Sequence, residues 1–374
     1  MPKTMKVALV HDFLNQVGGA EKVLRIFHEM FPKAPVYTIS YDKEDTGGVF
    51  EDMDIRTSFI QKMPFGVKRY KWYLSLMPAA VERFDLSRYD VVISDSSAYA
   101  KGVITNPETL HICYCHSPTR YLWSDTHKYT DELRQPSIVK QALPLVLNKI
   151  RTWDRVAADR VDHYIANSKT VQDRISKYYS QDSHVIYPPV ETKRFNISKE
   201  VGDYYLIVGR LRPYKRVDIA VEAFNALDMP LKIIGTGEEI GNLKKIAGPN
   251  IEFLGALPNK EMAEYLANCR AFIHPQEEDF GIAAVEAAAA GRPVIAYRKG
   301  GAMETVKEGI TGEFFDDQTP WSLVDTIRDF DHSKYDPEVI RKSALEFDED
   351  IFKKKVKDYF DQALQKHQQK YHNR

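Results

Sequence analysis

The strongest chemical signal in the sequence is the stretch from Glu278 to Glu286, which follows an apolar run ending at His274. Gly281 lets a ligand approach the backbone, and the alanine-rich residues after it predict a helix. The first N–H groups of a helix have no partner inside it and bind anions. This stretch therefore predicts an anion site.

Two carboxylates flank the predicted anion site. They would repel a diphosphate unless each accepts hydrogen bonds from hydroxyl groups. We therefore interpret Glu278, in the loop, as a contact of a donor sugar, and Glu286, one turn into the helix, as a contact of a ribose. The alternative is that Glu278 is an ordinary loop carboxylate and that Glu286 lies on an exposed helix face.

A second candidate site is the cationic stretch from Gly209 to Arg216, directly after the apolar run 204–208. Open α/β sheets bind ligands at the carboxyl ends of their strands. Arg210 can contact two phosphate oxygens at once, and Lys215 supplies a compact charge against a leaving group. The alternative is a solvated surface, because four cations stand within seven residues.

Two weaker signals lie in the first half of the chain. Gly18 and Gly19 follow the first apolar run and permit close backbone approach at a helix start, but they match neither a dinucleotide fingerprint nor a Walker loop. A plain strand-to-helix turn explains them equally well. His116 follows another apolar run and could donate to a sugar hydroxyl, although a lone histidine is more often structural.

These candidates need elements to position them, and the sequence alternates short β-branched runs with amphipathic stretches. Near-continuous apolar runs such as 7–10, 91–93, 111–114 and 163–166 are typical of parallel strands buried on both faces. The same pattern restarts at 204–208 and continues to 293–297. We expect an α/β protein with two doubly wound Rossmann-like domains.

Domain boundaries follow from the prolines and from the last helical pattern. Pro188 and Pro189 favour an extended connector. We therefore expect a first domain over residues 1–188, a second over 189–349, and a C-terminal helix and tail over 350–374. That helix could pack back on the first domain, although its lysine-rich pattern also fits a solvated face.

Composition narrows the function class and the compartment. With 52 Lys and Arg against 53 Asp and Glu, the net charge of −1 gives no reason to expect a nucleic-acid partner. No segment has the length and apolarity of a signal peptide or a membrane span. Three sparse cysteines are expected to be buried thiols, which predicts a reducing, cytoplasmic location.

The order of these motifs resembles that of the family-4 retaining glycosyltransferases of GT-B fold, and the matching residues are Gly18, Gly19, His116, Arg210, Lys215, Glu278 and Glu286. Segments such as 111–118, 187–190 and 213–218 further resemble the bacterial mannosyltransferases of O-antigen and exopolysaccharide assembly. One departure is Asp279, where such enzymes commonly have glycine. We expect its side chain to point outward.

The resemblance implies two domains that face a cleft, the first binding the acceptor and the second the nucleotide sugar. Arg210 and Lys215 would neutralise the diphosphate, so that no metal or other cofactor is needed, and the backbone of Phe280, Gly281 and Ile282 would contact phosphate. Glu278 would hold the hexose, Glu286 the ribose, and His116 would act on the transferred sugar together with the nearby Gly18-Gly19 turn. The implied donor is GDP-mannose, and the implied acceptor is a saccharide or lipid-linked glycan.

Two alternatives share this architecture. A nucleotide-sugar epimerase of GT-B fold would bind the same donor without an acceptor, and an inactive nucleotide-sugar-binding protein would keep the fold without the chemistry. An NAD-dependent enzyme is disfavoured, because no glycine fingerprint with its later acidic residue is present.

Residues 59–78 suggest where a lipid-linked acceptor would be met. The segment has four cations and no acidic residue, interleaved with aromatic side chains. Basic residues attract anionic headgroups, and aromatic rings settle at the membrane interface. We expect peripheral contact with the inner face of the membrane through this segment. The alternative is that Trp72, Leu74 and Leu76 belong to the core and that the cations form a solvated edge.

Overall fold

The computed structural model describes residues 5–126 and 137–372. Within these, the chain divides into two compact units. Unit 1 comprises the chain up to Tyr187 together with the segment from Lys353 onward, and unit 2 runs from Pro188 to Phe352. The connection between them at 187–188 falls in the Tyr-Pro-Pro-Val segment, where proline disfavours both helix and interior strand.

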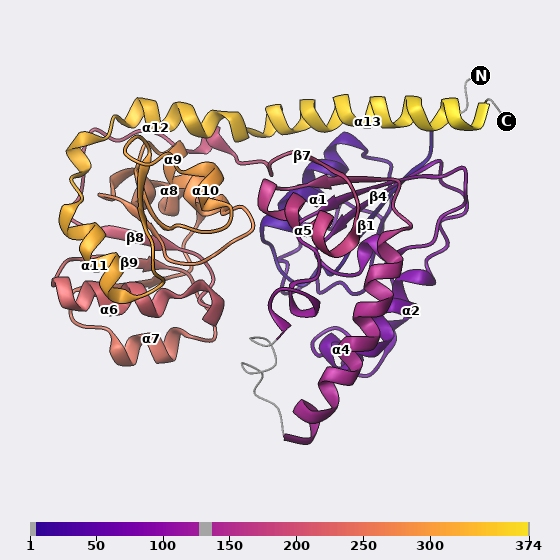
Figure 1. Ribbon diagram of the computed structural model, residues 1–374, viewed down its shortest axis with the longest axis horizontal. Coiled ribbons are helices and arrows are strands. Elements are labelled where there is room, and N and C mark those ends of the chain that lie inside the picture. Colours follow the sequence, from indigo (N-terminus) through magenta and orange to yellow (C-terminus); the bar gives the residue numbers. More distant parts are fainter. Residues whose placement is uncertain (1–4, 127–136, 373–374) are drawn as a thin grey trace. The chain divides into compact units, whose positions relative to one another are not determined.

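Unit 1 is built on a seven-stranded sheet in the order β3-β2-β1-β4-β5-β6-β7, and every strand pair is parallel. Figure 1 labels β1, β4 and β7 of this sheet. Its strands are β1 (Val7–His11), β2 (Val36–Thr38), β3 (Ile55–Thr57), β4 (Val91–Ser96), β5 (Leu110–Cys115), β6 (His163–Ala166) and β7 (Ser183–Val185). Its helices before the C-terminal segment are α1 (Gly19–Met30), α2 (Met77–Glu82), α4 (Ser137–Ala158) and α5 (Lys169–Tyr179). Short 3₁₀ turns are η1 (Phe59–Lys62), η2 (Tyr70–Leu76), η3 (Ala100–Gly102) and η4 (Arg120–Leu122).

Unit 2 is built on a six-stranded parallel sheet in the order β10-β9-β8-β11-β12-β13. Its strands are β8 (Tyr205–Val208), β9 (Leu231–Ile234), β10 (Ile251–Gly255), β11 (Phe272–His274), β12 (Val294–Tyr297) and β13 (Gly312–Phe315). Its helices are α6 (Val217–Leu227), α7 (Ile240–Ile246), α8 (Asn259–Asn268), α9 (Ile282–Ala289), α10 (Ala302–Thr305), α11 (Pro320–Asp329) and α12 (Pro337–Ala344). Its 3₁₀ turns are η5 (Thr192–Arg194), η6 (Pro213–Lys215), η7 (His332–Lys334) and η8 (Leu345–Phe347).

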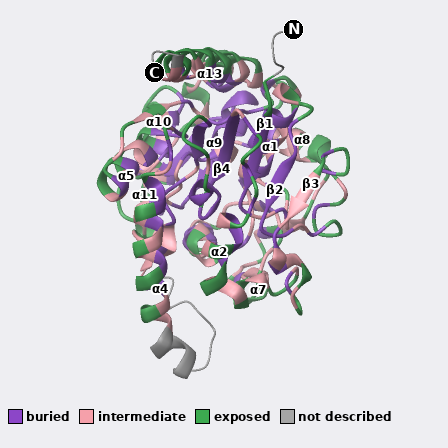
Figure 2. Ribbon diagram, turned by 90° about the vertical axis from the view of Figure 1, so that its right-hand side faces the viewer, coloured by how far each residue is buried: buried purple, intermediate pink, exposed green. Residues whose placement is uncertain are grey.

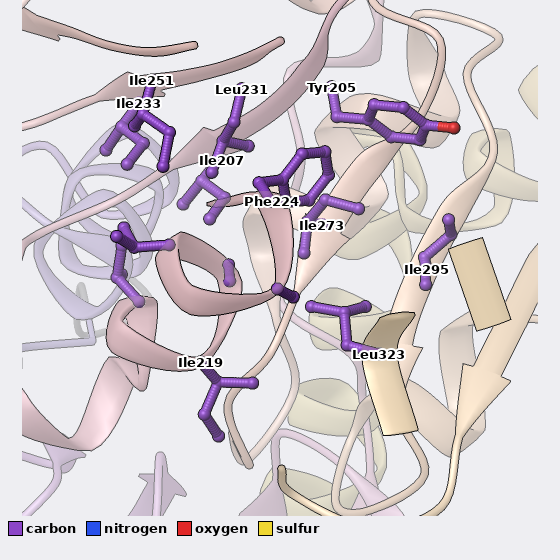
Figure 3. Packing of buried hydrophobic residues seen from close by; sticks show 14 of the residues in the cluster. Tyr205, Ile207, Ile219, Phe224, Leu231, Ile233, Ile251, Ile273, Ile295 and Leu323 are labelled. Carbon is purple, nitrogen blue, oxygen red and sulfur yellow. The ribbon is translucent and has the colours of Figure 1, made fainter. Parts of the chain in front are cut away.

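The two sheets confirm the predicted α/β class with two Rossmann-like domains. Strands β4 and β5 are buried along their whole length, as expected of parallel strands covered on both faces. Figure 2 shows β4 in the colour of buried residues. In unit 2, isoleucines from neighbouring strands pack against Phe224 of α6 and Leu323 of α11 in one cluster (Figure 3). The three cysteines are buried and free, as predicted.

Helix α13 (Glu349–His372) begins in unit 2, and its residues from Lys353 onward belong to unit 1. Its apolar face repeats at Val356, Phe360 and Ala363, which are all buried. The ring of Phe360 lies 5.2 Å from that of Phe31 at the end of α1. The helix therefore packs back on the first domain, as expected, while lysines on its other side are exposed.

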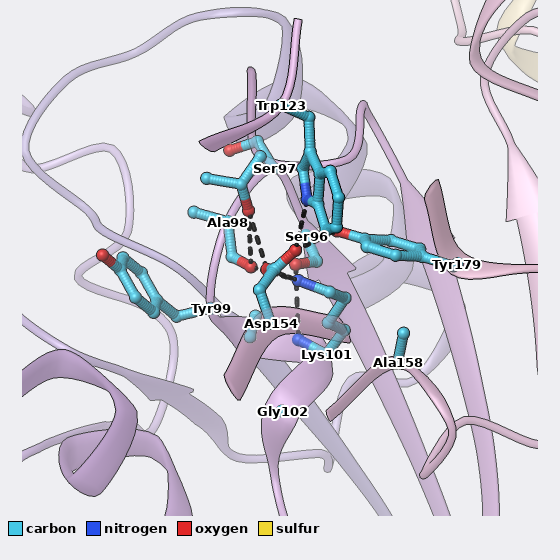
Figure 4. A network of polar contacts seen from close by, with 12 residues as sticks. Ser96, Ser97, Ala98, Tyr99, Lys101, Gly102, Trp123, Asp154, Ala158 and Tyr179 are labelled. Atoms are coloured by element: carbon cyan, nitrogen blue, oxygen red, sulfur yellow. Dashed lines mark hydrogen bonds and ion pairs between the residues drawn. The ribbon is translucent and has the colours of Figure 1, made fainter. Parts of the chain in front are cut away.

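A buried ion pair ties the loop after β4 to the helices of unit 1 (Figure 4). The ammonium of Lys101 lies 2.5 Å from Asp154 of α4, and both side chains are almost fully buried. The same carboxylate accepts hydrogen bonds from Thr119, Trp123 and Tyr179. Because breaking a buried pair leaves an unbalanced charge, this network holds the loops at the carboxyl edge of the sheet in one arrangement.

Candidate functional site

The carboxyl edge of the unit 2 sheet brings the two strongest sequence motifs together. Strands β8 and β11 are neighbours at the point where the strand order reverses, which is where open parallel sheets bind ligands. Gly209 and Arg210 directly follow β8, and Lys215 ends the 3₁₀ turn η6 in the same loop. The loop after β11 carries Glu278.

An ion pair links these two loops, because the ammonium of Lys215 contacts a carboxylate oxygen of Glu278. Each side chain keeps about a fifth of its surface exposed, so a ligand at this edge can reach both. Arg210 is half-buried on the same loop as Lys215. The predicted phosphate-binding cation and the predicted sugar-binding carboxylate therefore lie in direct contact, although their motifs are more than 60 residues apart in the chain.

Beneath this pair lies His274, the last residue of β11, which is fully buried. Burial and the positive charge of Lys215 lower the pKa of His274 to about 3, so its ring is neutral at physiological pH. Its Nδ1 is 3.1 Å from the amide nitrogen of Gln276, whereas its Nε2 has no hydrogen-bond partner. A Cβ added at Gly281 would lie 3.2 Å from that Nε2, so the helix start passes close to this ring.

Helix α9 starts as the sequence predicted. Gly281 is its N-cap with a φ of 92°, a conformation that L side chains rarely adopt. The loop before it packs tightly on Gly300 and Gly301, since a Cβ at Gly300 would lie 2.3 Å from the carbonyl oxygen of Glu278. Glycine at these positions lets two backbones meet and fixes the direction of the α9 N-terminus.

The remaining predicted residues of this edge differ in exposure. Phe280 is buried and its ring packs 5.3 Å from that of Phe347, so its side chain belongs to the core of unit 2. Ile282 and Asp279 are half-buried. Glu286 is only 6% exposed and pairs with the guanidinium of Arg194 at 3.0 Å, so the alternative that it lies on an exposed helix face is wrong.

The carboxyl edge of the unit 1 sheet carries the other two motifs. Gly18 is the extended N-cap of α1 and Gly19 is its first residue. The neighbouring loop, after β4, is held by Asp12. Its carboxylate accepts four backbone N–H groups, from residues 97 to 100, and the hydroxyl of Ser97, over 2.6–3.1 Å.

His116 stands directly after β5 and is part of a buried cluster that sequence reasoning missed. Its Nε2 lies 2.5 Å from one oxygen of Asp95, and the other oxygen of Asp95 lies 2.8 Å from Nδ1 of His11. Nε2 of His11 lies 3.9 Å from Glu21 in the first turn of α1. His11, Asp95 and Glu21 are almost fully buried, while the His116 side chain is 13% exposed.

His11 is the group whose charge state this cluster changes most. Burial disfavours the charged form of His11, but the hydrogen bond to Asp95 and the nearby carboxylate of Glu21 outweigh it and raise the pKa of His11 to about 10. Burial also opposes ionisation of the two carboxyls, yet the histidines lower the pKa of Asp95, and His11 lowers that of Glu21. At neutral pH the cluster therefore holds a protonated His11 between two carboxylates.

Comparison with known proteins places the whole arrangement in a family. Residues 17–194 match the family model described as Glycosyltransferase Family 4, and residues 190–347 match the model described as Glycosyl transferases group 1. The chain belongs to the glycosyltransferases that these two models together describe. Its two motif-bearing sheet edges are thus the candidate active-site elements of a glycosyltransferase.

Two curated relatives and one solved structure illustrate the likeness. The glycosyltransferase is 24% identical over 315 residues to O-antigen chain mannosyltransferase C of Escherichia coli, covering 76% of each chain. Over 110 residues it is 37% identical to the GDP-mannose-dependent alpha-mannosyltransferase of Corynebacterium glutamicum, covering 29% of this chain and 26% of the relative. The structure of Anabaena HepE in complex with UDP aligns with a TM-score of 0.70 and 17% identity, covering 96% of this chain and 100% of that one.

Coverage of the relatives is uneven. Among the first four curated relatives, the alignment spans 58%, 48% and 26% of the relative's own length in three, whereas it spans 86% of the mannosyltransferase ALG2 of Dictyostelium discoideum. The structural likeness shows the GT-B fold, which agrees with the predicted pair of Rossmann-like domains.

The segment 59–78 of the glycosyltransferase divides between core and surface. Leu74 is partly buried and packs against the hydrophobic core of unit 1, in line with part of the alternative interpretation. Tyr70 packs against the same core, with its ring 4.6 Å from that of Phe13. Phe65, Trp72 and Leu76, by contrast, are 64%, 61% and 37% exposed, so the alternative is wrong for Trp72 and Leu76. In the described residues no helix has the length and apolarity to cross a membrane.

The cations of this segment also divide. Arg69 stacks on both exposed rings, with its guanidinium carbon 5.3 Å and 4.6 Å from the ring centres of Phe65 and Trp72. Lys68 instead lies 2.8 Å from the buried carboxylate of Asp42, so its charge is already balanced.

Acidic side chains in the described part of the chain form no group of three or more that could hold a metal ion. Asp-x-Asp triplets do occur in the sequence, at 52–54, 329–331 and 348–350, but none directly follows a strand of either sheet. Asp52 and Asp54 pair with Arg25 and Arg56.

Stability at alkaline pH tests the charge assignment of His11. Its pKa is about 10 in the folded protein against 6.5 for an unperturbed ring, so its proton stabilises the folded state fully below pH 6.5 and this stabilisation is lost as pH rises toward 10. Between these values the free energy of unfolding of wild type should fall more steeply than that of His11→Gln, by up to about 1.4 kcal/mol per pH unit. Urea unfolding at pH 7, 8 and 9, followed by tryptophan fluorescence, measures both slopes.

His111→Gln is the matched control, because burial lowers the pKa of His111 to about 4 and its ring is already neutral above pH 7. This variant should keep the wild-type slope. Equal slopes for wild type and His11→Gln would show that His11 is not protonated in the folded state.

Proposed function

We propose that this glycosyltransferase transfers mannose from GDP-mannose, with retention of anomeric configuration and without a metal, to a saccharide or lipid-linked glycan acceptor in surface polysaccharide synthesis. The observation that carries the proposal is the contact between Lys215 and Glu278 beside the α9 N-terminus. It joins a cation, a carboxylate and a helix start, which are the groups that a sugar diphosphate requires. The mannosyltransferase names of two relatives support the choice of sugar and nucleotide.

Each residue at the unit 2 edge then has one role. Arg210 and Lys215 bind the diphosphate, and the backbone of Phe280, Gly281 and Ile282 donates to its oxygens. Glu278 exchanges Lys215 for a hydroxyl of the hexose when the diphosphate takes over the ammonium. Glu286 accepts from the ribose, for which Arg194 holds its carboxylate in place.

The chemical step needs no protein base in this proposal. The acceptor oxygen bonds to the anomeric carbon on the face from which the diphosphate leaves, the bond to the diphosphate oxygen breaks, and the acceptor proton passes to that oxygen. The cations stabilise the charge that develops on the leaving group.

The domains divide the substrates between them in this proposal. We assign residues 1–188, with His116 and the Gly18-Gly19 turn, to the acceptor and the transferred sugar. Residues 189–349 are assigned to the nucleotide sugar, and residues 350–374 form the C-terminal helix and tail.

Removing either phosphate-binding cation tests this assignment. Arg210→Ala and Lys215→Ala should each reduce mannose transfer by about 10-fold to 100-fold, because each deletes a charge-assisted hydrogen bond to the diphosphate. Arg212→Ala is the matched control, since Arg212 pairs with Glu238 on the surface at 2.9 Å. Transfer measured with radiolabelled GDP-mannose should be unchanged in Arg212→Ala. A chelator should have little effect on transfer by wild type. Full activity of Arg210→Ala, or strict dependence on added manganese, would contradict the assignment.

The two glutamates should separate nucleotide binding from sugar binding. Glu286→Gln should weaken the binding of free GDP, because the ribose contact is present in GDP as well as in the donor. Glu278→Gln should leave GDP binding intact and reduce transfer, since its partner is the hexose and Lys215 remains available to phosphate. Titration calorimetry with GDP and a transfer assay measure the two effects. An equal loss of GDP affinity in both variants would refute the separate roles.

We also propose that the exposed part of segment 59–78 contacts an anionic membrane surface and that the protein works at the cytoplasmic face of the inner membrane. The exposed rings of Phe65 and Trp72 with the adjacent Arg69 and Lys71 supply the aromatic and basic groups that such a surface binds.

Liposome flotation tests this contact. Wild type should float with anionic vesicles at low salt and less at high salt, because the attraction is screened. Arg69→Glu, Lys71→Glu should lose flotation, whereas the control Lys354→Glu, Lys355→Glu, with the same charge change on exposed residues of α13, should keep it. Equal flotation of both double variants would show that the attraction is not specific to this segment.

A further inference from the structure

Four ionisable side chains lie in one row at the carboxyl edge of the unit 1 sheet. His11 and Asp95 are register partners on the adjacent parallel strands β1 and β4, so their side chains stand side by side. His116 follows β5, the next strand, and Glu21 reaches the row from α1. The strand order reverses between β1 and β4, so the row lies at the switch point of the sheet, where ligands bind.

Asp95 is the centre of the row. Its two carboxylate oxygens lie 2.5 Å from Nε2 of His116 and 2.8 Å from Nδ1 of His11, and its side chain is 1% exposed. An ionised carboxylate only accepts hydrogen bonds, so each of these two ring nitrogens carries a proton. The hydrogen on His116 Nε2 leaves Nδ1 as the ring nitrogen that does not face Asp95.

We propose that Asp95 is a positioning residue that holds the His116 ring in the Nε2–H form and presents Nδ1 to a hydroxyl of the transferred sugar, with His11 and Glu21 holding Asp95 in turn. This inference rests on the role of His116 in the proposed function. In a ring of this form Nδ1 accepts a hydrogen bond from the hydroxyl, whereas the other tautomer would turn a donor toward it. This reverses the direction expected from the sequence, in which His116 donates to the sugar, because its Nε2 faces Asp95.

His11 has a separate part in the arrangement. Being protonated, His11 balances the negative charge of Asp95. Its Nδ1 donates to the carboxylate oxygen of Asp95 that does not contact His116. Glu21 lies at the far side of His11, and the amide of Gln16 donates to Glu21 at 3.2 Å. The orientation of His116 is thus fixed by residues that need not touch the substrate themselves.

Nitrogen NMR of the imidazole rings measures the tautomer directly and does not depend on activity. In protein labelled with ¹⁵N-histidine, the resonance that disappears in His116→Asn should show the Nε2–H form in wild type. In Asp95→Asn the His116 ring should shift to the Nδ1–H form or to a mixture. An Nδ1–H ring in wild type, or an unchanged ring in Asp95→Asn, would overturn the inference, and the wild-type measurement stands even if the variant folds poorly.

A double-mutant cycle then asks whether Asp95 acts through His116. Asp95→Asn should lower kcat of transfer by about 10-fold to 100-fold with little change in KM for the donor, and should have no further effect in a His116→Ala background. Ser94→Ala is the control for a general weakening of β4, because Ser94 is buried beside Asp95 and bonds His111 instead. It should leave kcat unchanged.

Additive losses in the double variant would overturn positioning through His116. If wild type transfers no sugar from any nucleotide donor, the proposed function fails, and the tautomer measurement still decides whether Asp95 fixes the ring.

Discussion

A buried charge needs a counter-charge in contact with it, and this constraint shapes both sheet edges of the protein. The free-energy cost of moving an unpaired ion out of water far exceeds the net stability of a typical folded domain. Accordingly Asp95 stands between two histidines, Lys215 contacts Glu278, and Glu286 pairs with Arg194. These pairs stabilise little by themselves, but each fixes the orientation of the groups it joins.

The same constraint explains why two histidines at strand ends have opposite charge. His11 ends β1 between two carboxylates, which raise its pKa, whereas His274 ends β11 fully buried near Lys215, and burial and that positive charge lower its pKa. Burial disfavours the charged ring in both places, so the neighbours decide the outcome. A strand-end histidine is therefore a cation in unit 1 and a neutral ring in unit 2.

Further contacts hold in place the loops that carry the candidate site residues at the two sheet edges. Asp12 collects the N–H groups of the loop after β4, and the pair of Lys101 and Asp154 ties the same region to α4. In unit 2 the close approach of Gly300 to the Glu278 backbone has a similar effect without any charge. The glycosyltransferase thus holds its candidate site residues on backbone that is fixed before a substrate arrives.

The sequence by itself determined the alternation of strands and helices, the glycine start of α9 and the candidate residues His116, Arg210, Lys215, Glu278 and Glu286. Hydrophobic periodicity and backbone-specific residues are local properties, so the chain reveals them without its fold. Only the tertiary structure decided which side chains meet. Asp95 and Glu21 look like ordinary acids in the sequence, and the pairing of Glu286 with Arg194 joins residues 92 positions apart. Their partners and charges depend on strand order and burial, because hydrogen bonds and desolvation act through space and not along the chain.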